Sequence, residues 1–332
     1  MIKVALIGLP LSGKTTIFNA LTSLKAKGRN IGVVKILDER LDCLHRLYPE
    51  KKKVSSEIEF IDTHPIKTET KILDLANIDA IAIVIRCFEE PIEPIKEVKT
   101  ISQELILSDL LIAEKRIANL APKGRKMTQG EEKEKAVIER CRDSLSKEIP
   151  IRRIGLIEDE RRHLSSYQFL SDKPIVLVGN IDEQRKDEEL KEYARVNNEQ
   201  CVIIPGKLEM EVAELEENER ASFLKELGIK ESALPLVIRT IYTSLSLISF
   251  FTIGKDEVRL WPIKKGTNAL KAAGKIHSDM ERGFIRASVV SYKDFLENQG
   301  SIAHLKEKGL LRLEGKDYIV SDGDIIEFKF NV

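Results

Sequence analysis

The sequence predicts an α/β domain that carries an inserted helical hairpin and is followed by a small β-rich domain. Short apolar runs alternate with helical patterns over residues 1–95 and again over residues 171–248, as expected of a sheet covered by helices on both faces. Residues 96–170 instead show charged sequence at helical spacing. Residues 249–332 contain short strand candidates separated by turn signals. These three patterns set the predicted domain boundaries.

The first α/β segment begins with a strand buried on both faces. Residues 3–7 form a near-continuous apolar run, which such a strand requires. A helix is predicted at residues 38–48, and further strands are predicted at residues 32–36, 58–62, 80–86, 174–178 and 201–204. Because the strand pattern returns after the charged region, the hairpin is predicted to be an insertion within one domain.

The inserted region and the C-terminal region have different periodicities. Apolar residues recur near helical spacing from Ile101 to Ile117, and a charged helical pattern resumes over residues 131–147. Pro122 and Gly124 lie between these two helical patterns and break the helix. The sequence therefore predicts an antiparallel helical hairpin. After Ser249 strands are predicted at residues 250–253, 257–262, 284–290, 312–313, 317–320 and 325–330.

Composition excludes several classes of protein. The chain has 332 residues, of which 42% are hydrophobic and 33% charged, so packed cores are expected and a disordered protein is not. No apolar run approaches the ~20 residues of a transmembrane helix, and the N-terminus does not resemble a signal peptide. The four cysteines form no Cys-x-x-Cys pair, which argues against a zinc site or a disulfide framework. We therefore expect a cytoplasmic protein without a membrane partner.

One motif points directly to phosphate binding. Residues 8–15 read Gly-Leu-Pro-Leu-Ser-Gly-Lys-Thr and match the pattern G-x-x-x-x-G-K-[ST] at every fixed position. The motif follows a buried strand and opens a helix predicted at residues 15–24, where backbone N–H groups and the helix N-terminus can bind phosphates. We expect Lys14 to reach the β- and γ-phosphates and Thr15 to hold Mg²⁺. The predicted nucleotide contacts here are Gly8, Pro10, Leu11, Ser12, Gly13, Lys14, Thr15 and Thr16.

Residues 58–62 provide a candidate partner for the magnesium ion. They form an apolar strand that ends in Asp62, which is typical of the carboxylate near Mg²⁺ in phosphate-loop sites. The alternative is that Asp62 only caps the turn after its strand. Because the phosphate loop is also present, we favour Thr15 and Asp62 as the metal-holding pair.

A third segment is the candidate for recognising the base of the nucleotide. Residues 180–183 read Asn-Ile-Asp-Glu and follow an apolar strand, so Asn180 and Glu183 correspond to the ends of the guanine-binding N-K-x-D pattern. A carboxylate pairs with two N–H groups of guanine but would be repelled by N1 of adenine. The displaced carboxylate therefore weakens strict guanine specificity. Gly206 and Lys207 are predicted to form the second base-contacting loop, although an ordinary strand-to-turn junction would look the same.

Together these residues resemble the YchF family of Obg-like P-loop ATPases over nearly the whole chain. The similar segments are residues 8–22, 38–42, 85–88, 104–109, 274–277, 281–287, 312–320 and 322–332. The resemblance implies a P-loop NTPase domain, an inserted coiled-coil hairpin and a C-terminal TGS domain of β-grasp type. It also implies ATP preferred over GTP through the Asn-x-x-Glu form, and association with ribosomes.

The chain departs from this family where hydrolysis would be supported. The threonine of the family's first switch has no counterpart after the phosphate-loop helix. Pro65 replaces the second-switch glycine and offers no N–H to the γ-phosphate. Ile83 occupies the position of a family histidine proposed to help position the attacking water. His64 is the nearest imidazole that could compensate, unless it is simply an exposed loop residue.

Basic patches are the candidate contacts with nucleic acid. Zero net charge excludes a strong global field, so such contacts must be local. The hairpin tip has five basic residues and no acid, which suits phosphate-backbone contact but also fits a solvated helix end; they are Lys115, Arg116, Lys123, Arg125 and Lys126. In the C-terminal domain Arg259, Lys264 and Lys265 form a second candidate, and Trp261 is predicted to be a core anchor rather than a base-stacking platform.

Two functions remain open from the sequence. The leading hypothesis is a nucleotide-binding regulatory protein, using ATP and/or GTP, that associates with ribosomes and hydrolyses nucleotide weakly. The alternative is a catalytically inactive pseudo-GTPase that acts as a ribosome, RNA or protein interaction module. A small-molecule kinase would share the phosphate loop, but the C-terminal block and the Asn-x-x-Glu loop argue against it.

Overall fold

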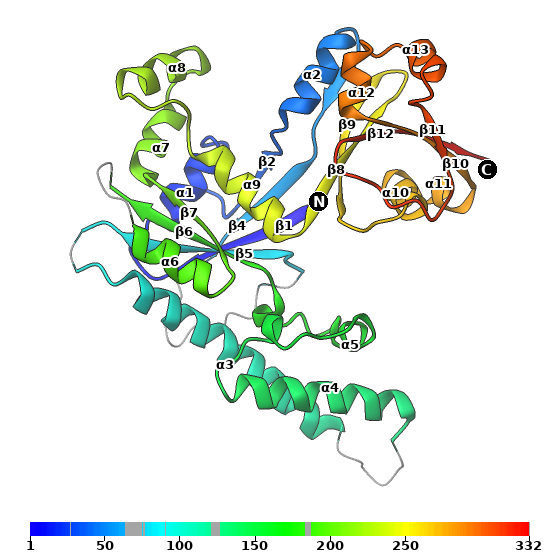
Figure 1. Ribbon diagram of the computed structural model, residues 1–332. Helices are drawn as coiled ribbons and strands as arrows, with labels where there is room; N and C mark the ends of the chain where they lie inside the picture. The colour runs from blue at the N-terminus through cyan, green and yellow to red at the C-terminus, as the bar shows by residue number, and fades with distance from the viewer. Residues whose placement is uncertain are drawn as a thin grey trace. The chain divides into compact units, whose positions relative to one another are not determined.

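The chain divides into two compact units, which are described separately (Figure 1). The computed structural model describes residues 1–26, 28–63, 75, 77–89, 91–120, 127–182 and 187–331. The P-loop unit contains residues 2–33 and 59–244, and the C-terminal unit contains residue 1, residues 34–58 and residues 245–332. None of the helices in the described ranges combines the length and the apolar character that a bilayer-spanning segment requires.

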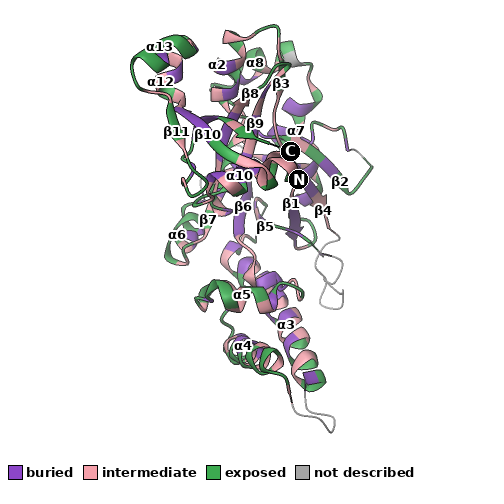
Figure 2. Ribbon diagram, turned by 90° about the vertical axis from the view of Figure 1, so that its right-hand side faces the viewer, coloured by how far each residue is buried: buried purple, intermediate pink, exposed green. Residues whose placement is uncertain are grey.

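The P-loop unit is built on a six-stranded sheet in the order β2-β4-β1-β5-β6-β7. Its strands are β1 (Ile2–Gly8), β2 (Ile31–Lys35), β4 (Glu57–Asp62), β5 (Ala80–Cys87), β6 (Ile175–Ile181) and β7 (Gln200–Ile204). Strands β1, β5, β6 and β7 pair in parallel. Most of β5 and β6 is buried, as Figure 2 shows in purple, which explains why their sequences are apolar throughout.

Helices cover this sheet and position the loops at the carboxyl ends of its strands. They are α1 (Lys14–Leu21), α6 (Glu188–Val196), α7 (Gly206–Glu214), α8 (Glu217–Glu226) and α9 (Leu234–Ser244). A core on one face joins Ile83 and Leu177 of the sheet to Ile101 of the hairpin. In parallel α/β sheets, ligands bind beyond the carboxyl ends of the strands, so this edge is where the site is expected.

The predicted helical hairpin is present as α3 (Pro94–Leu120) and α4 (Gln129–Leu145), which lie side by side in Figure 1. A capping box between Thr128 and Glu131 starts α4. Ala113 and Cys141 belong to the buried apolar cluster between the helices. Short elements follow: η2 (Ile151–Arg153), α5 (Glu158–Leu164) and η3 (Leu170–Asp172). The predicted breaker residues Pro122 and Gly124 lie outside the described residues.

A buried carboxylate joins the hairpin to the segment that returns to the sheet. Asp109 of α3 is 0% exposed and accepts hydrogen bonds from the backbone N–H groups of Leu170 and Ser171, over 2.9 and 2.6 Å. Burial raises the pKa of Asp109 from 3.8 to about 6, although the hydrogen bonds from Ser171 and Leu170 act in the opposite direction. Asp109 thereby fixes the turn before β6.

The C-terminal unit contains a second six-stranded sheet in the order β11-β10-β12-β8-β9-β3. Its strands are β3 (Lys52–Val54), β8 (Leu247–Ile253), β9 (Glu257–Lys264), β10 (Phe284–Ser291), β11 (Arg312–Glu314) and β12 (Asp324–Phe330). Its helices are α2 (Glu39–Leu47), α10 (Ala269–Ile276), α11 (Ser278–Arg282), α12 (Tyr292–Glu297) and α13 (Ile302–Glu307). Separate apolar clusters contain Phe251 and Phe250, so both faces of the sheet are covered.

Two sequence-based expectations differ from the structure of this unit. Residues 317–320 are not a strand, because Ile319 makes only an isolated bridge to Asn268 while the Tyr318 hydroxyl donates to Asp324 over 2.8 Å. Residues 34–58 group with the C-terminal unit rather than with the P-loop unit. The reason is packing: α2 buries Leu41 and Leu44 in the cluster around Phe251, and β3 pairs in parallel with β9.

Candidate nucleotide-binding site

The phosphate loop connects β1 to α1 by a turn that depends on two glycines. A Cβ atom on Gly8 would lie 2.8 Å from the carbonyl oxygen of Val84, so the loop leaves the sheet where only glycine fits. Gly13 has φ 79° and precedes the first residue of α1. Leu11, with φ 66°, is 82% exposed at the crest of the loop. The backbone therefore curls ahead of a helix N-terminus, which is the geometry that binds phosphate groups.

Lys14, Thr15 and Asp62 meet at the base of this loop. Lys14 is only 5% exposed, and its ammonium contacts Oδ1 of Asp62 and the carbonyl oxygen of Thr63. The Thr15 hydroxyl donates to Oδ2 of Asp62 over 2.9 Å. Asp62 thus joins the two side chains that the sequence assigned to phosphate and to Mg²⁺. The arrangement supports Asp62 as part of the site rather than as a turn cap.

Asn180 ties the phosphate loop to the loop after β7. Its side-chain amide donates to the carbonyl oxygen of Ser12 over 3.0 Å, and its Oδ1 accepts from the N–H of Gly206 over 3.0 Å. Both neighbouring glycines make room for it: a Cβ on Gly13 or Gly206 would lie 2.1 or 2.5 Å from the Asn180 amide. Asn180 is 4% exposed, so both loops are held from inside the protein.

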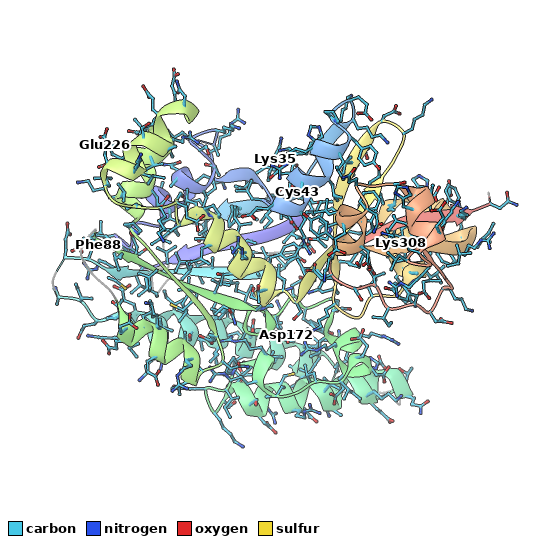
Figure 3. The ribbon with its side chains drawn as sticks, turned by 45° about the horizontal axis from the view of Figure 1, so that its top comes forward. Lys35, Cys43, Phe88, Asp172, Glu226 and Lys308 are labelled. Atoms are coloured by element: carbon cyan, nitrogen blue, oxygen red, sulfur yellow. The ribbon has the colours of Figure 1, made fainter. Side chains whose placement is uncertain are left out.

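A cavity of about 590 Å³ opens beside Gly13. Its lining includes Phe88 and Pro205 together with Asn180 and Lys207. Figure 3 labels Phe88 just beyond the end of β5. This volume lies within the range of about 300–1,000 Å³ typical of small-molecule sites. A flat ring and a pentose could therefore lie next to the phosphate loop.

Glu97 of α3 holds the end of β5 from which Phe88 extends. Its carboxylate accepts from the Arg86 N–H over 3.1 Å and lies 3.6 Å from the Arg86 guanidinium. Burial raises the pKa of Glu97, while the contacts with Arg86 lower it. The Arg86 guanidinium also donates to the carbonyl oxygen of Pro91 over 3.3 Å. These contacts fix the backbone on both sides of Phe88.

Comparison with known proteins decides the family. The chain is 37% identical to "Ribosome-binding ATPase YchF" of Bacillus subtilis, over 98% of each chain, and 37% identical to the protein of the same name from Haemophilus influenzae, over 99% of each. The chain belongs to the YchF family. A family model for the C-terminal region of YchF GTPases, described as a protein of unknown function (DUF933), matches residues 247–331. A YchF GTPase from Schizosaccharomyces pombe has a similar structure, with a TM-score of 0.84 and 27% identity over 99% of this chain and 97% of that one.

Within this YchF-family chain, the structure brings most of the predicted site residues together. Gly13, Thr16, Asn180 and Lys207 line the cavity, and Gly206 bonds to Asn180 behind it. Glu183 and His64 lie outside the described residues, so their predicted roles are untested. Further lining residues were missed from sequence: Phe88, Glu89, Ile181, Asp182, Pro205 and Leu208. They lie at or within four residues after the carboxyl ends of β5, β6 and β7, and that position was the available signal.

A buried apolar residue stands where the resemblance led us to look for a histidine. Ile83 is 0% exposed in the sheet, paired in register with Leu177 of β6, and cannot replace a histidine chemically. After α1, the Thr22 hydroxyl donates to the carbonyl oxygen of Phe18 over 2.9 Å and is packed against Gly32. Thr22 is therefore a packing residue at the end of α1. Pro65 lies outside the described residues.

The candidate nucleic-acid patches also change in the structure. Arg116 is not a free cation at the hairpin tip, because it donates to Glu134 over 2.8 Å and lies over the Tyr167 ring. Lys123, Arg125 and Lys126 lie outside the described residues. In the C-terminal unit, Trp261 donates to Thr252 over 2.9 Å and stacks near Phe250, as expected of a core anchor.

Proposed function

We propose that this chain binds Mg²⁺-nucleoside triphosphate, with ATP bound at least as well as GTP. The observation that carries the proposal is the Asn180 bridge, which fixes the phosphate loop and the Gly206 loop on either side of one cavity of about 590 Å³. The phosphate loop supplies backbone N–H groups, and the cavity supplies Phe88 and Leu208 as apolar surface for a base. The printed name of several relatives, "Ribosome-binding ATPase YchF", agrees with an adenine nucleotide.

A magnesium ion fits the oxygen atoms at the base of the loop. Thr15 Oγ1 and Asp62 Oδ2 are 2.9 Å apart, and both are the hard oxygen ligands that Mg²⁺ prefers. We infer that these two residues hold the ion when nucleotide is bound. Bound magnesium would neutralise charge on the β- and γ-phosphates. Lys14 already reaches this position, so a short movement of its ammonium would place it on the phosphates.

Hydrolysis by the isolated chain is proposed to be slow. Phosphoryl transfer depends on positioning and charge neutralisation, and the chain retains the residues for binding. Ile83 is apolar and fully buried, so it cannot orient an attacking water, and the first-switch threonine implied by the resemblance has no counterpart in the sequence. His64 remains the candidate for compensation. The functional cycle would then depend on nucleotide exchange or on a partner.

The proposed partner is the ribosome, in the cytoplasm. The relatives carry this partner in their name, and basic residues at the hairpin tip offer sequence-independent contacts to RNA phosphates. The test replaces Lys123, Arg125 and Lys126 by Gln and measures co-sedimentation with ribosomes over a salt series. We expect weaker binding, a smaller salt slope and unchanged nucleotide affinity. Unaltered co-sedimentation would remove the tip from the interface.

One observation favours the second candidate, an interaction module with an unused phosphate loop. Lys14 is already neutralised by Asp62, as in a site whose charges serve only stability. Titration with fluorescent mant-ATP separates the candidates, using the wild type, Lys14→Ala and the control Lys3→Ala. Lys3 pairs with Glu59 over 3.2 Å at the other end of β1. Saturable binding lost only in Lys14→Ala supports nucleotide binding, and its absence from the wild type supports the module.

A further inference from the structure

The C-terminal unit contains a second cavity, of about 600 Å³, that the proposed nucleotide site does not use. It lies between helices α12 and α13 and one face of strands β10, β11 and β12, which are neighbours in Figure 1. Tyr48 and Lys51, from the segment before β3, complete the lining. All of these residues belong to the same compact unit, so the cavity is a property of that unit alone.

The inner part of the cavity is apolar. Val290, Phe295 and Ile325 line it and are 2%, 1% and 6% exposed. Two further lining residues are large, apolar and exposed to solvent, namely Ile302 at 45% and Leu313 at 61%. Burying such surface is favourable by about 25 cal/mol per Å². A ligand with an apolar body would cover the exposed pair and contact the buried wall.

The outer part of the cavity is basic. Arg286, Lys306 and Lys329 line it, and all three are exposed. Within the described ranges none of the three makes an ion pair, and Glu327, the acidic lining residue, makes none either. Lys51 is different, because it donates to the Gly254 carbonyl over 2.8 Å and lies over the Tyr48 ring. The cavity therefore has more free positive than negative charge at its rim.

Two of these cations oppose each other directly in the sheet. Arg286 of β10 and Lys329 of β12 are register partners in an antiparallel pair. Like charges directly opposite each other destabilise a sheet. Glu327 lies on the same face, opposite Ser288 and two residues from Lys329, but within the described residues it forms an ion pair with neither cation. An anion between the two side chains would turn the repulsion into two favourable contacts.

Ser288 adds a polar atom deeper in the cavity. It lines the cavity, is 6% exposed, and lies one step along the same face from Arg286. In the described part of the chain its hydroxyl has no hydrogen-bond partner. A serine hydroxyl can both donate and accept, so at this depth of the cavity it is available to an oxygen atom of a ligand.

We propose that this cavity binds a small amphipathic anion whose apolar body contacts Val290, Phe295 and Ile325 and whose acidic head lies between Arg286 and Lys329. The volume suits a single small molecule rather than a folded partner. The head is a carboxylate or a phosphate, since Arg and Lys bind either. Nucleotide is not required, so this proposal stands or falls independently of the phosphate loop.

Decanoate and decyl phosphate are suitable probes, and decan-1-ol is the neutral control. Methyl NMR spectra of the full chain, without nucleotide, follow the Val290 and Ile325 signals during titration. We expect saturable shifts with a Kd below about 1 mM for at least one anion, and the tighter anion identifies the head group. The double variant Arg286→Gln with Lys329→Gln should weaken anion binding by about tenfold or more while leaving decan-1-ol binding unchanged.

The matched control is Lys265→Gln with Lys316→Gln, which removes the same charge from exposed positions that do not line the cavity. Ile302→Glu places a negative charge at the rim and should also weaken anion binding, by repulsion. The proposal is overturned if neither anion gives saturable shifts below about 1 mM. It is equally overturned if the control variant weakens binding as much as the rim variant, or if only ribosomal RNA perturbs these methyl signals.

Discussion

The side-chain amide of Asn180 donates a hydrogen bond to the backbone carbonyl of Ser12 over 3.0 Å. The bond crosses from the end of β6 to the phosphate loop, and the same side chain accepts from Gly206 over 3.0 Å. One buried amide therefore sets the separation of the two loops that border the cavity. Nucleotide affinity should depend on Asn180 even if the side chain does not touch the base.

Asn180→Ala should lower nucleotide affinity by about tenfold or more, because each buried hydrogen-bonding group left without a partner costs about 1–3 kcal/mol. Equilibrium titration with mant-ATP measures the effect. Asn298→Ala is the matched control: it removes another buried amide, which donates to Asp294 over 2.8 Å in the C-terminal unit. If both variants bind nucleotide like the wild type, the Asn180 bridge does not shape the site.

Asp62→Asn should remove most of the magnesium dependence of nucleotide binding. In the wild type Asp62 contacts Lys14 as well as Thr15, so the ion both gains a ligand and frees the Lys14 ammonium. The mant-ATP affinity measured with EDTA should differ from the affinity measured with Mg²⁺ for the wild type. For Asp62→Asn the two affinities should agree closely. Asp79→Asn is the control, because Asp79 accepts from the Lys3 N–H over 2.8 Å at the start of β1. An unchanged EDTA effect in Asp62→Asn would contradict the assignment.

ATP should bind at least as well as GTP. Ile181 and Asp182 line the cavity where the guanine-binding pattern has its middle residues, and its final aspartate is replaced by Glu183. Competition between the two nucleotides for mant-ATP tests this directly. A preference for GTP of about tenfold, or ~1.4 kcal/mol, would show that a carboxylate still binds the guanine base specifically.

Steady-state turnover of the isolated chain should stay well below the ~1 s⁻¹ low end of typical enzymes. Ile83 is buried in the sheet and cannot orient water, and the first-switch threonine implied by the resemblance has no counterpart in the sequence. One lost transition-state donor commonly costs about 10²–10³ in rate. Faster turnover that is lost in His64→Ala as well as in Lys14→Ala would assign catalysis to His64.

The base of the hairpin should lose stability as pH rises from about 4 to 7, because the buried carboxyl of Asp109 loses its proton in this range. Its pKa in the folded state is raised from 3.8 to about 6, so the folded state binds the proton more tightly than the unfolded state does. The stabilisation is complete below the lower pKa and is lost above the higher one, a change on the order of 3 kcal/mol. In thermal or urea unfolding, Asp109→Asn should lack this pH-dependent part of the unfolding free energy.

The comparison is between the wild type and Asp109→Asn at each pH, because other groups titrate in both. The difference in unfolding free energy should shift in favour of the variant as pH rises through about 6. Asp143→Asn is the control, since Asp143 is exposed on α4. A difference that stays constant across this range would mean that Asp109 titrates normally.

Much of the fold could be predicted because local sequence carries its signal. Buried parallel strands need unbroken apolar runs, so β1, β5 and β6 were visible, and the fixed residues of the phosphate loop follow from local backbone geometry. The short helices α10, α12 and α13 were missed, although each begins at a capping side chain: Asn268, Ser291 and Ser301. Residues 317–320 have strand-like composition but no neighbouring strand to pair with.

By itself the sequence determined the phosphate loop, the alternation of strands and helices and the hairpin, because each depends on residues close together in the chain. Only the tertiary structure decided which side chains meet. It joined Lys14 to Asp62, joined Asn180 to Ser12 and placed residues 34–58 with the C-terminal sheet. It also set Arg286 opposite Lys329. These contacts link residues far apart in sequence, and long-range packing leaves no periodic pattern from which they could be read.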